Sequence, residues 1–332
     1  MYCKIILVNW NRASDTCACI SSLINDRRHQ CNIVVCENGS PDNSAEQIDS
    51  FLSLLFLRKL RGIVNGATVV DFFEHTESSS ISEPSVTLVL SRNNLGFAGG
   101  NNLALSATHP DIYSDYIWFL NNDTEVEPDT LDIMIERMQA DPKIGICGST
   151  LVYAHDRKTI QAYGGATYSK LTGAVREIGN QNLHNFPVDR EAVEAEMDYV
   201  SGASMLVSRR FLEEVGPISE DYFLYYEEID WAVRARRAGY RLGYAPEAIV
   251  YHKEGAVLGS GNSSGRSLLA EYYGVRNRII FTRKFFPWAL PTVFLFSALQ
   301  VVRRCMQGRW SHARLMAEVL LGLRRVAPGT KQ

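Results

Sequence analysis

The chain has 332 residues, a formal net charge of −3 and 46% hydrophobic residues. This composition excludes a disordered, collagen-like or coiled-coil protein, and the length allows one large domain or two smaller ones. The net charge gives no reason to expect a nucleic-acid partner. The charge is unevenly distributed, because residues 276–332 contain eleven basic residues and one acidic residue and so carry +10, which leaves −13 on residues 1–275.

Seven cysteines are present, five of them within the first 36 residues, and no C-x-x-C pattern occurs. We expect buried free thiols, as in the reducing cytosol, and no cysteine-based zinc site. The N-terminus begins directly with a strand pattern, without a basic segment followed by an apolar stretch. We therefore expect no signal peptide and a cytoplasmic protein.

Short apolar runs rich in β-branched residues alternate with helical patterns. Strands are predicted at 4–8, 32–36, 86–90, 116–120, 144–147 and 247–252. Helices are predicted after a Ser14 N-cap, from Ser44, and at about 98–108, 129–140, 208–215 and 226–238. This alternation is typical of βαβ units and predicts an α/β fold with a mostly parallel sheet.

Residues 58–84 interrupt this alternation and become rich in serine. We interpret them as a surface insertion with a mobile tip near 78–82, and substrate contact is the alternative. Residues 150–200 have weak periodicity and are expected to contribute to an acceptor pocket, with a mobile lid at 259–265. We predict a catalytic domain at 1–270 and a helical tail at 271–332.

The predicted tail contains an uncharged, mostly apolar stretch at 285–302, with prolines at 287 and 291. Eighteen such residues are marginal for crossing a bilayer. Arginines interspersed with apolar residues follow, which is more typical of a basic amphipathic surface. We predict that residues 276–332 contact an anionic membrane, and a helical cap on the catalytic domain is the alternative.

Polar residues follow three of the predicted strands. Asn121, Asn122 and Asp123 come after the strand at 116–120, and their oxygens suit Mg²⁺ or Mn²⁺ at the carboxyl edge of a sheet. A turn that caps the next helix is the alternative interpretation. Glu37 follows the strand at 32–36 and is placed to accept hydrogen bonds from a nucleoside. The glycine-rich stretch 92–102 lacks the dinucleotide pattern but permits close approach of an anion.

A predicted helix carries Glu227, Glu228 and Asp230 within four positions. Glu227 and Asp230 share a face with Arg234, so ion pairing alone is one interpretation. Glu228 points about 100° away from Glu227 and is free to act as a general base. His252 ends the strand at 247–252 and becomes a candidate metal ligand only if that strand ends beside Asp123.

In this order and spacing, the motifs resemble family 2 glycosyltransferases with the GT-A fold, and most closely a bacterial rhamnosyltransferase-like branch. The resemblance covers about residues 3–255. It is carried by ILVNWN (6–11), ENGSPDNS (37–44), NNLGFAGGNN (93–102), FLNNDTEV (119–126), SGASMLVSRR (201–210) and YYEEIDWAVRARRAGYR (225–241).

The resemblance implies that Asp123 binds the Mg²⁺ or Mn²⁺ ion within a D-x-D-like motif and that His252 completes the metal shell. Glu228 falls at the position of the catalytic base, and Glu227 is its rival. Glu37 falls where relatives have an Asp that contacts the nucleotide. The candidate nucleotide- and donor-binding residues are Asn9, Asn11, Glu37, Asn38, Arg92, Asn94, Gly99, Asn102, Asn121 and Asn122.

The implied activity is an inverting, metal-dependent transfer of a sugar from a nucleotide donor to a cell-surface polysaccharide or lipid-linked glycan. The expected donor is dTDP-rhamnose, with UDP-galactofuranose or a UDP-hexose as alternatives. A non-catalytic module that binds sugar nucleotides or glycans is the alternative from another functional class. The expected location is the inner face of the cell membrane, as a peripheral protein.

Overall fold

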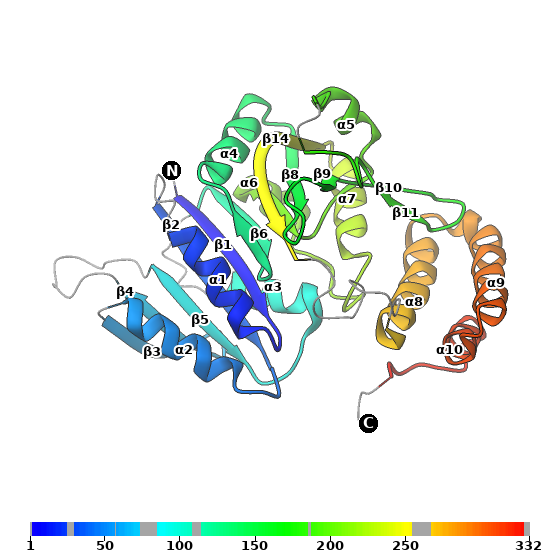
Figure 1. The fold of residues 1–332 in the computed structure, drawn as a ribbon, viewed down its shortest axis with the longest axis horizontal. Helices are drawn as coiled ribbons and strands as arrows, with labels where there is room; N and C mark the ends of the chain where they lie inside the picture. The colour runs from blue at the N-terminus through cyan, green and yellow to red at the C-terminus, as the bar shows by residue number, and fades with distance from the viewer. Residues whose placement is uncertain are drawn as a thin grey trace.

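The computed structural model describes residues 2–24, 30–56, 58–73, 85–107, 114–184, 187–253 and 267–328. A twisted mixed sheet, parallel in its central strands, lies at its centre and is covered by helices on both faces (Figure 1). In sheet order its strands are β3 (Arg58–Val64), β4 (Ala67–Phe73), β5 (Val86–Ser91), β2 (Gln30–Asn38), β1 (Tyr2–Asn9), β6 (Tyr116–Asn121), β13 (Ser204–Ser208), β8 (Ile144–Tyr153), β14 (Arg241–His252) and β7 (Thr124–Val126), and β9 (Ile160–Tyr163) pairs with β8. The parallel neighbours are β1 with β2 and β6, β2 with β5, and β8 with β14. The predicted α/β fold is therefore confirmed.

A second, three-stranded sheet consists of β10 (Gly165–Tyr168), β11 (Val175–Glu177) and β12 (Tyr199–Val200). This small sheet lies within the stretch at 150–200 for which the sequence predicted no regular elements.

The helices are α1 (Ala13–Ile24), α2 (Ser44–Leu55), α3 (Gly96–Ser106), α4 (Thr130–Ala140), α5 (Arg190–Glu196), α6 (Arg209–Val215), α7 (Glu227–Arg237), α8 (Leu268–Phe285), the short 3₁₀ helix η1 (Pro287–Ala289), α9 (Leu290–Met306) and α10 (Trp310–Leu320). The six helices with a predicted position, α1 to α4, α6 and α7, begin within two residues of it, whereas α5 was not predicted. Helix α1 begins at Ala13, so Ser14 lies inside it and the prediction of Ser14 as its N-cap was wrong.

Two hydrophobic cores lie on opposite faces of the sheet. Helices α1, α2 and α4 cover one core, and α3, α6 and α7 cover the other. Successive side chains of β1 alternate between them: Ile5 and Leu7 face the first core, whereas Ile6 faces the second. Buried strands in a sheet covered on both faces read as continuous apolar runs, which is why the sequence identified them.

The stretch expected as an insertion at 58–84 contains an antiparallel hairpin, β3–β4, that extends the sheet because β4 pairs with β5. Asn65 and Gly66 form its two-residue turn with φ values of 49° and 81°. Asn-Gly is the strongest short hairpin signal, so the hairpin was visible in the sequence. The predicted tip at 78–82 and the predicted lid at 259–265 lie outside the described residues.

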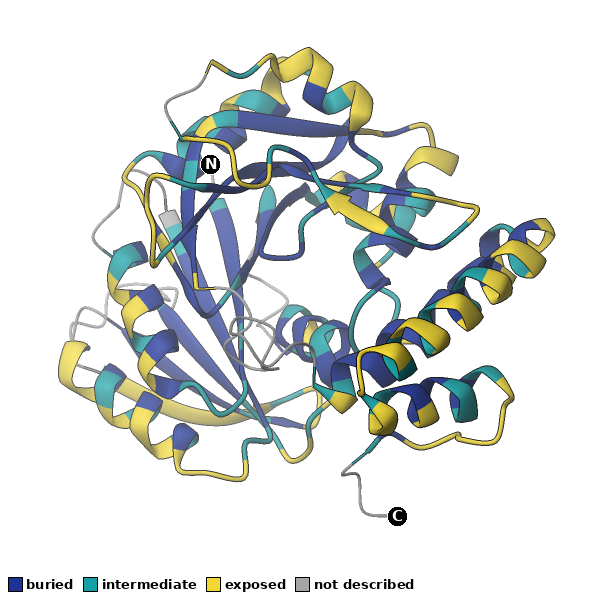
Figure 2. Cartoon of the chain, turned by 45° about the vertical axis from the view of Figure 1, so that its right-hand side comes forward, coloured by how far each residue is buried: buried dark blue, intermediate teal, exposed yellow. Residues whose placement is uncertain are grey.

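Helices α8, α9 and α10 pack against one another at the C-terminal end of the chain. The predicted boundary at 271 falls inside α8, and this helix is tied to α7 by an ion pair between Lys284 and Asp230, 2.9 Å apart. Among the described residues, one helical stretch, Pro287–Met306, is long and apolar enough to cross a membrane. Exposed residues run along the outer face of these helices (Figure 2).

Candidate active site

The strands β1, β2 and β6 end at one edge of the sheet and bring three predicted site residues together. Their parallel register pairs Asn9 with Glu37 and Val8 with Asn121. Glu37 is buried, and its Oε1 accepts a hydrogen bond from the backbone N–H of Ser40 at 3.0 Å. This is the edge where open α/β sheets bind ligands, so the topology supports the predicted location of the site.

Two of the predicted donor-binding residues, Asn9 and Asn122, make hydrogen bonds that stabilise the carboxyl edge of the sheet. Thr16 of α1 donates a hydrogen bond to Oδ1 of Asn9 at 2.8 Å and accepts one from Nδ2 of Asn122 at 2.8 Å. All three side chains are buried. This network fixes the turn after β6 against the end of β1 and the start of α1, and so fixes the backbone that carries Asp123.

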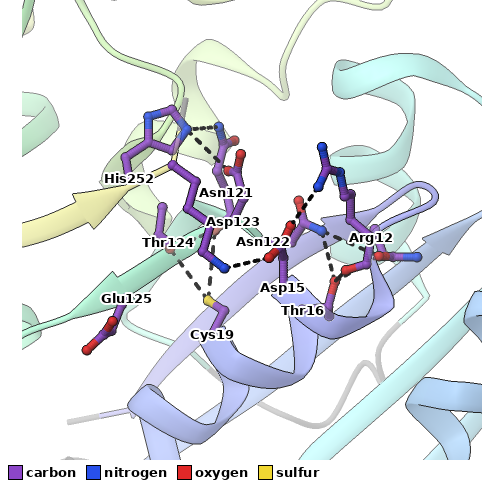
Figure 3. A network of polar contacts seen from close by, with 12 residues as sticks. Arg12, Asp15, Thr16, Cys19, Asn121, Asn122, Asp123, Thr124, Glu125 and His252 are labelled. Atoms are coloured by element: carbon purple, nitrogen blue, oxygen red, sulfur yellow. Dashed lines mark hydrogen bonds and ion pairs between the residues drawn. The ribbon is translucent and has the colours of Figure 1, made fainter. Parts of the chain in front are cut away.

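The carboxylate of Asp123 faces the imidazole of His252 (Figure 3). Oδ1 of Asp123 lies 3.2 Å from Nε2 of His252, and Nδ2 of Asn121 lies 3.3 Å from the same nitrogen. Strand β14 makes this contact possible because it pairs antiparallel with β7, with His252 opposite Thr124. The strand that carries His252 thus ends beside Asp123, which is the condition under which the sequence made His252 a candidate ligand.

Burial alone would raise the pKa of Asp123, but the hydrogen bond and charge of His252 outweigh burial and lower it. The guanidinium of Arg12 adds a smaller lowering effect on this pKa. Asp123 is therefore a carboxylate at neutral pH, as a metal ligand must be.

The protonation pattern of His252 suits a metal ion between the two side chains. Nδ1 donates to Oε1 of the buried Gln161 at 2.9 Å. When the ring is protonated, Nε2 donates to the carboxylate of Asp123, and this is the state in which His252 lowers the pKa of Asp123. When the ring is neutral, the lone pair of Nε2 points at that carboxylate, and a cation between them takes the place of the proton. Metal-binding histidines commonly donate their second ring nitrogen in this way.

Asp123 and His252 form a pair, and the described residues contain no group of three or more His, Cys, Asp or Glu that could hold a metal ion. The pair fits Mg²⁺ or Mn²⁺ because such ions in nucleotide enzymes take one or two protein ligands and complete their shell with phosphate oxygens and water.

Glu228 lies on the first turn of α7 and its carboxylate packs against Gly202. A Cβ atom at position 202 would collide with Oε1 of Glu228, so the carboxylate could not keep this place beside any other residue. The next residue, Ala203, accepts a backbone hydrogen bond from Asn121 at 3.0 Å. Glu228 is thereby placed next to the segment that leads into Asp123. Burial raises the pKa of Glu228 to about 7, the value expected of a base that acts near neutral pH.

Glu227 is completely buried, and its Oε2 has no hydrogen-bond partner among the described residues. Burial, followed by the charge of Glu228, raises its pKa well above the ordinary range. Burial therefore favours the protonated form of Glu227, which makes this residue the weaker candidate for the base.

The predicted ion pair on α7 is present, but it leaves Glu227 out. Arg234 Nε lies 2.7 Å from Oδ1 of Asp230, whose Oδ2 accepts hydrogen bonds from Tyr222 at 2.8 Å and from Lys284 at 2.9 Å. The interpretation that ion pairing on α7 engages Glu227 was wrong, because the side chain of Glu227 is buried away from Arg234.

Several residues of the predicted donor site make contacts within the fold. Asn38 donates to Asn94 Oδ1 at 3.2 Å and to the carbonyl of Gly96 at 3.0 Å. Asn102 donates to the carbonyl of Ile218 at 2.9 Å. Of the remaining three, Arg92 is exposed just after β5 and Gly99 lies within α3. Asn11 lies between β1 and α1, where its backbone N–H donates to Oγ of Ser40 at 3.0 Å.

Four polar residues around Asp123 and His252 were not identified from the sequence, namely Arg12, Asp15, Gln161 and Lys253. Asp15 of α1 bridges Arg12 at 3.4 Å and Lys253 at 2.5 Å, and the backbone N–H of Lys253 donates to the carbonyl of Asp123 at 3.1 Å. The charge of Arg12 acts on the Asp123 carboxylate, and the backbone of Lys253 is hydrogen-bonded to that of Asp123. Lys253 could have been found from the sequence, because it directly follows the candidate ligand His252. Gln161 lies in no motif that would have indicated it.

The profile of the family described as "Glycosyl transferase family 2" matches residues 4–216. The chain belongs to glycosyl transferase family 2. This glycosyltransferase is 21% identical over 267 residues to "Low-salt glycan biosynthesis hexosyltransferase Agl10" of Haloferax volcanii, over 76% of this chain and 81% of the relative. It is 25% identical over 257 residues to "N-acetylglucosaminyl-diphospho-decaprenol L-rhamnosyltransferase" of Mycobacterium tuberculosis, over 70% and 78%.

The glycosyltransferase is also similar in fold to the mannosyltransferase PcManGT from Pyrobaculum calidifontis, solved in complex with GDP-Man and Mn²⁺. The TM-score is 0.52 at 15% identity, over 97% of this chain and 81% of that chain. At this identity the likeness concerns the fold alone. The predicted GT-A fold is confirmed, with the C-terminal helices added to it.

Proposed function

We propose that this glycosyltransferase transfers a sugar from a nucleotide donor to a glycan acceptor with inversion at the anomeric carbon. One observation carries the proposal: Glu228, with a pKa of about 7, packs beside the segment that leads to the Asp123–His252 pair. A general base and a site for a divalent ion thus lie at the same edge of the sheet. That combination suits attack by a hydroxyl on a donor whose leaving group is a diphosphate.

The proposed donor is dTDP-rhamnose, and the proposed acceptor is a lipid-linked glycan or cell-surface polysaccharide. The rhamnosyltransferase from M. tuberculosis supports this choice, because its name states both a rhamnosyl donor group and a diphospho-decaprenol acceptor. UDP-galactofuranose and a UDP-hexose remain the alternative donors. The relative from H. volcanii supports keeping these alternatives, because its name states a hexosyltransferase and not a rhamnosyltransferase.

Each side chain has a separate role in the proposed reaction. Asp123 and His252 would hold Mg²⁺ or Mn²⁺, which when bound neutralises charge on the departing nucleoside diphosphate. Glu37 is placed to accept hydrogen bonds from the nucleoside. Glu228 removes the proton from an acceptor hydroxyl, and that oxygen forms a bond to the anomeric carbon as the bond to the diphosphate breaks. Attack from the face opposite the diphosphate inverts the configuration.

We further propose that the C-terminal helices place this enzyme on the cytoplasmic face of an anionic membrane. Leu295, Leu299, Val302 and Met306 recur at helical spacing on α9 and are 55–83% exposed. The surrounding residues 276–332 carry +10. An exposed apolar stripe surrounded by basic residues suits an anionic membrane, because the acyl chains are apolar and the headgroups are negatively charged.

A panel of sugar nucleotides tests the proposed function. We expect dTDP-rhamnose to raise the Tm of the full-length protein only when Mn²⁺ or Mg²⁺ is present, and to be hydrolysed slowly in the absence of acceptor. Stabilisation by a different nucleotide sugar would reassign the donor. Equal stabilisation by all donors with and without metal would contradict the metal-dependent reaction.

A further inference from the structure

The loop that leads into α7 has an unusual backbone. Phe223, Tyr225 and Tyr226 have φ values of 65°, 66° and 79°. Three of the four residues 223–226 therefore have a left-handed backbone, although none of the four is glycine. This conformation is unfavourable for L-residues with a Cβ atom, and it persists only where the surrounding structure imposes it. Residues held in this way cluster at functional sites. The loop ends directly at Glu227 and Glu228.

One buried side chain from α8 holds this loop. Nδ2 of Asn277 lies 2.8 Å from the carbonyl oxygen of Tyr222, 2.7 Å from that of Leu224 and 3.1 Å from that of Tyr225. Asn277 is fully buried, and its Oδ1 accepts a hydrogen bond from Arg276 at 2.7 Å. A single amide group therefore shares its two N–H donors among three carbonyls that the left-handed turns bring together.

The opposite side of the loop is held by the glycine-rich motif. The backbone N–H of Phe97 donates to the carbonyl of Phe223 at 2.8 Å. Gly96 lies so close to Phe223 that an added Cβ would collide with this carbonyl, and its φ of 75° also requires glycine. The ring of Phe223 stacks on Tyr273 of α8, with 4.9 Å between the ring centroids.

The conformation of the loop determines where α7 begins. Tyr226 is the N-cap of α7, and its carbonyl accepts the first hydrogen bond of the helix, from Asp230 at 2.9 Å. Its hydroxyl donates to the carbonyl of Gly173 at 2.9 Å. A change in the backbone at 223–226 would therefore rotate or shift the first turn of α7, and with it the carboxylate of Glu228 against Gly202.

We propose that Asn277 is a positioning residue for Glu228. By holding three carbonyls of the strained loop, it fixes the first turn of α7 and keeps the base at the place where the acceptor hydroxyl must be deprotonated. This inference rests on the proposed function, in which Glu228 is the base. It gives helix α8 of the predicted C-terminal tail a part in the chemistry, separate from any contact with a membrane.

The test compares Asn277→Asp and Asn277→Ala with Val293→Ala in the full-length protein. Asn277→Asp keeps the shape of the side chain but replaces the N–H donors with an acceptor. Val293 is fully buried on α9, a different helix from the one that carries Asn277, so its variant controls for loss of packing in the C-terminal helices. We expect both Asn277 variants to lower kcat about 10- to 100-fold, the loss typical of a misplaced catalytic group.

The Kd and KM for the donor should change by less than about threefold in the same variants, because the Asp123–His252 pair is held by other elements. Val293→Ala should lower Tm with kcat nearly unchanged in the folded fraction. In a Glu228→Gln background, Asn277→Ala should cause no further loss of rate, because two residues that act through one group are not additive.

The outcomes separate the two proposals. Full transfer activity in Glu228→Gln would overturn the proposed base, whatever Asn277 does. If Glu228→Gln is inactive but the Asn277 variants keep the normal kcat, the positioning role is wrong. Equal loss of kcat in Val293→Ala, or a further loss when Asn277→Ala is added to Glu228→Gln, would also overturn it, because either result shows a general effect on the fold.

Discussion

Nε2 of His252 and Oδ1 of Asp123 lie 3.2 Å apart, at the ends of segments that are distant in sequence and joined by the pairing of β14 with β7. The two atoms are the candidate ligands of the divalent ion. Because Gln161 accepts a hydrogen bond from the other ring nitrogen, the pair is held ready for a cation.

Asp123→Asn is expected to abolish the dependence of donor binding on Mn²⁺. The amide keeps the size of the side chain but removes the charge that holds the ion. Titration of donor binding with and without Mn²⁺ measures the effect. Glu125→Gln is the matched control, since Glu125 is a neighbouring carboxylate that is 53% exposed and paired with Arg157. An unchanged metal titration in Asp123→Asn would remove Asp123 from the site.

Gln161→Leu is expected to weaken Mn²⁺ binding about 10- to 100-fold, although Gln161 is not itself a ligand. Without the acceptor at Nδ1, the ring of His252 loses both its orientation and the preference for a lone pair at Nε2. Electron paramagnetic resonance of free Mn²⁺ reports the affinity directly. Equal affinity in the variant would show that His252 is oriented by its other contacts.

Glu228→Gln is expected to lower the transfer rate about 10²- to 10⁴-fold while donor binding in the presence of metal is kept. Glu227→Gln is the comparison that separates the two candidates. Because burial favours the uncharged form of Glu227, replacing its carboxyl by an uncharged amide should change the rate far less. The opposite ranking of the two variants would make Glu227 the base.

The raised pKa of Glu228 also predicts two effects of pH. Activity should fall as pH decreases below about 7, because the base becomes protonated. Stability should change in the opposite sense. A carboxyl whose pKa rises on folding from its ordinary 4.5 to about 7 favours the folded state below pH 4.5, and this contribution is lost as pH rises through 7.

Glu228→Gln should therefore be more stable than the native protein at pH 8, by up to about 3 kcal/mol, with the difference vanishing near pH 4. Urea unfolding at the two pH values measures this. A variant that is no more stable than the native protein at pH 8 would contradict the raised pKa.

The sheet was predictable because its buried strands are continuous apolar runs, and the positions of Glu37 and Asp123 followed from the strands they end. The sequence alone could not predict that His252 lies beside Asp123, because this contact depends on where β14 pairs with β7. Gln161 and Asn277 could not be predicted. Each acts through a contact with a residue or loop distant in sequence, and neither lies in a pattern that distinguishes it from a surface amide.

The sequence also could not separate Glu227 from Glu228. Adjacent carboxylates on a helix differ by about 100° in direction, but which direction leads into the protein is decided by the loop that sets the start of α7. The resemblance to a family indicated Glu228, and the deep burial of Glu227 gives the physical reason for the same choice.

The exposed apolar stripe on α9 leads us to expect that the protein binds anionic vesicles. Deleting residues 276–332 would also remove Asn277, so point variants are the better test. Leu295→Glu combined with Leu299→Glu should abolish sedimentation with vesicles that contain phosphatidylglycerol. The native protein should bind them less as salt rises, because basic residues near the surface contribute about 1 kcal/mol each at low ionic strength.

Leu54→Glu on α2, where the side chain is 87% exposed, is the control and should bind normally. Loss of a dimer rather than of vesicle binding in the α9 variant would show that a second copy covers this face.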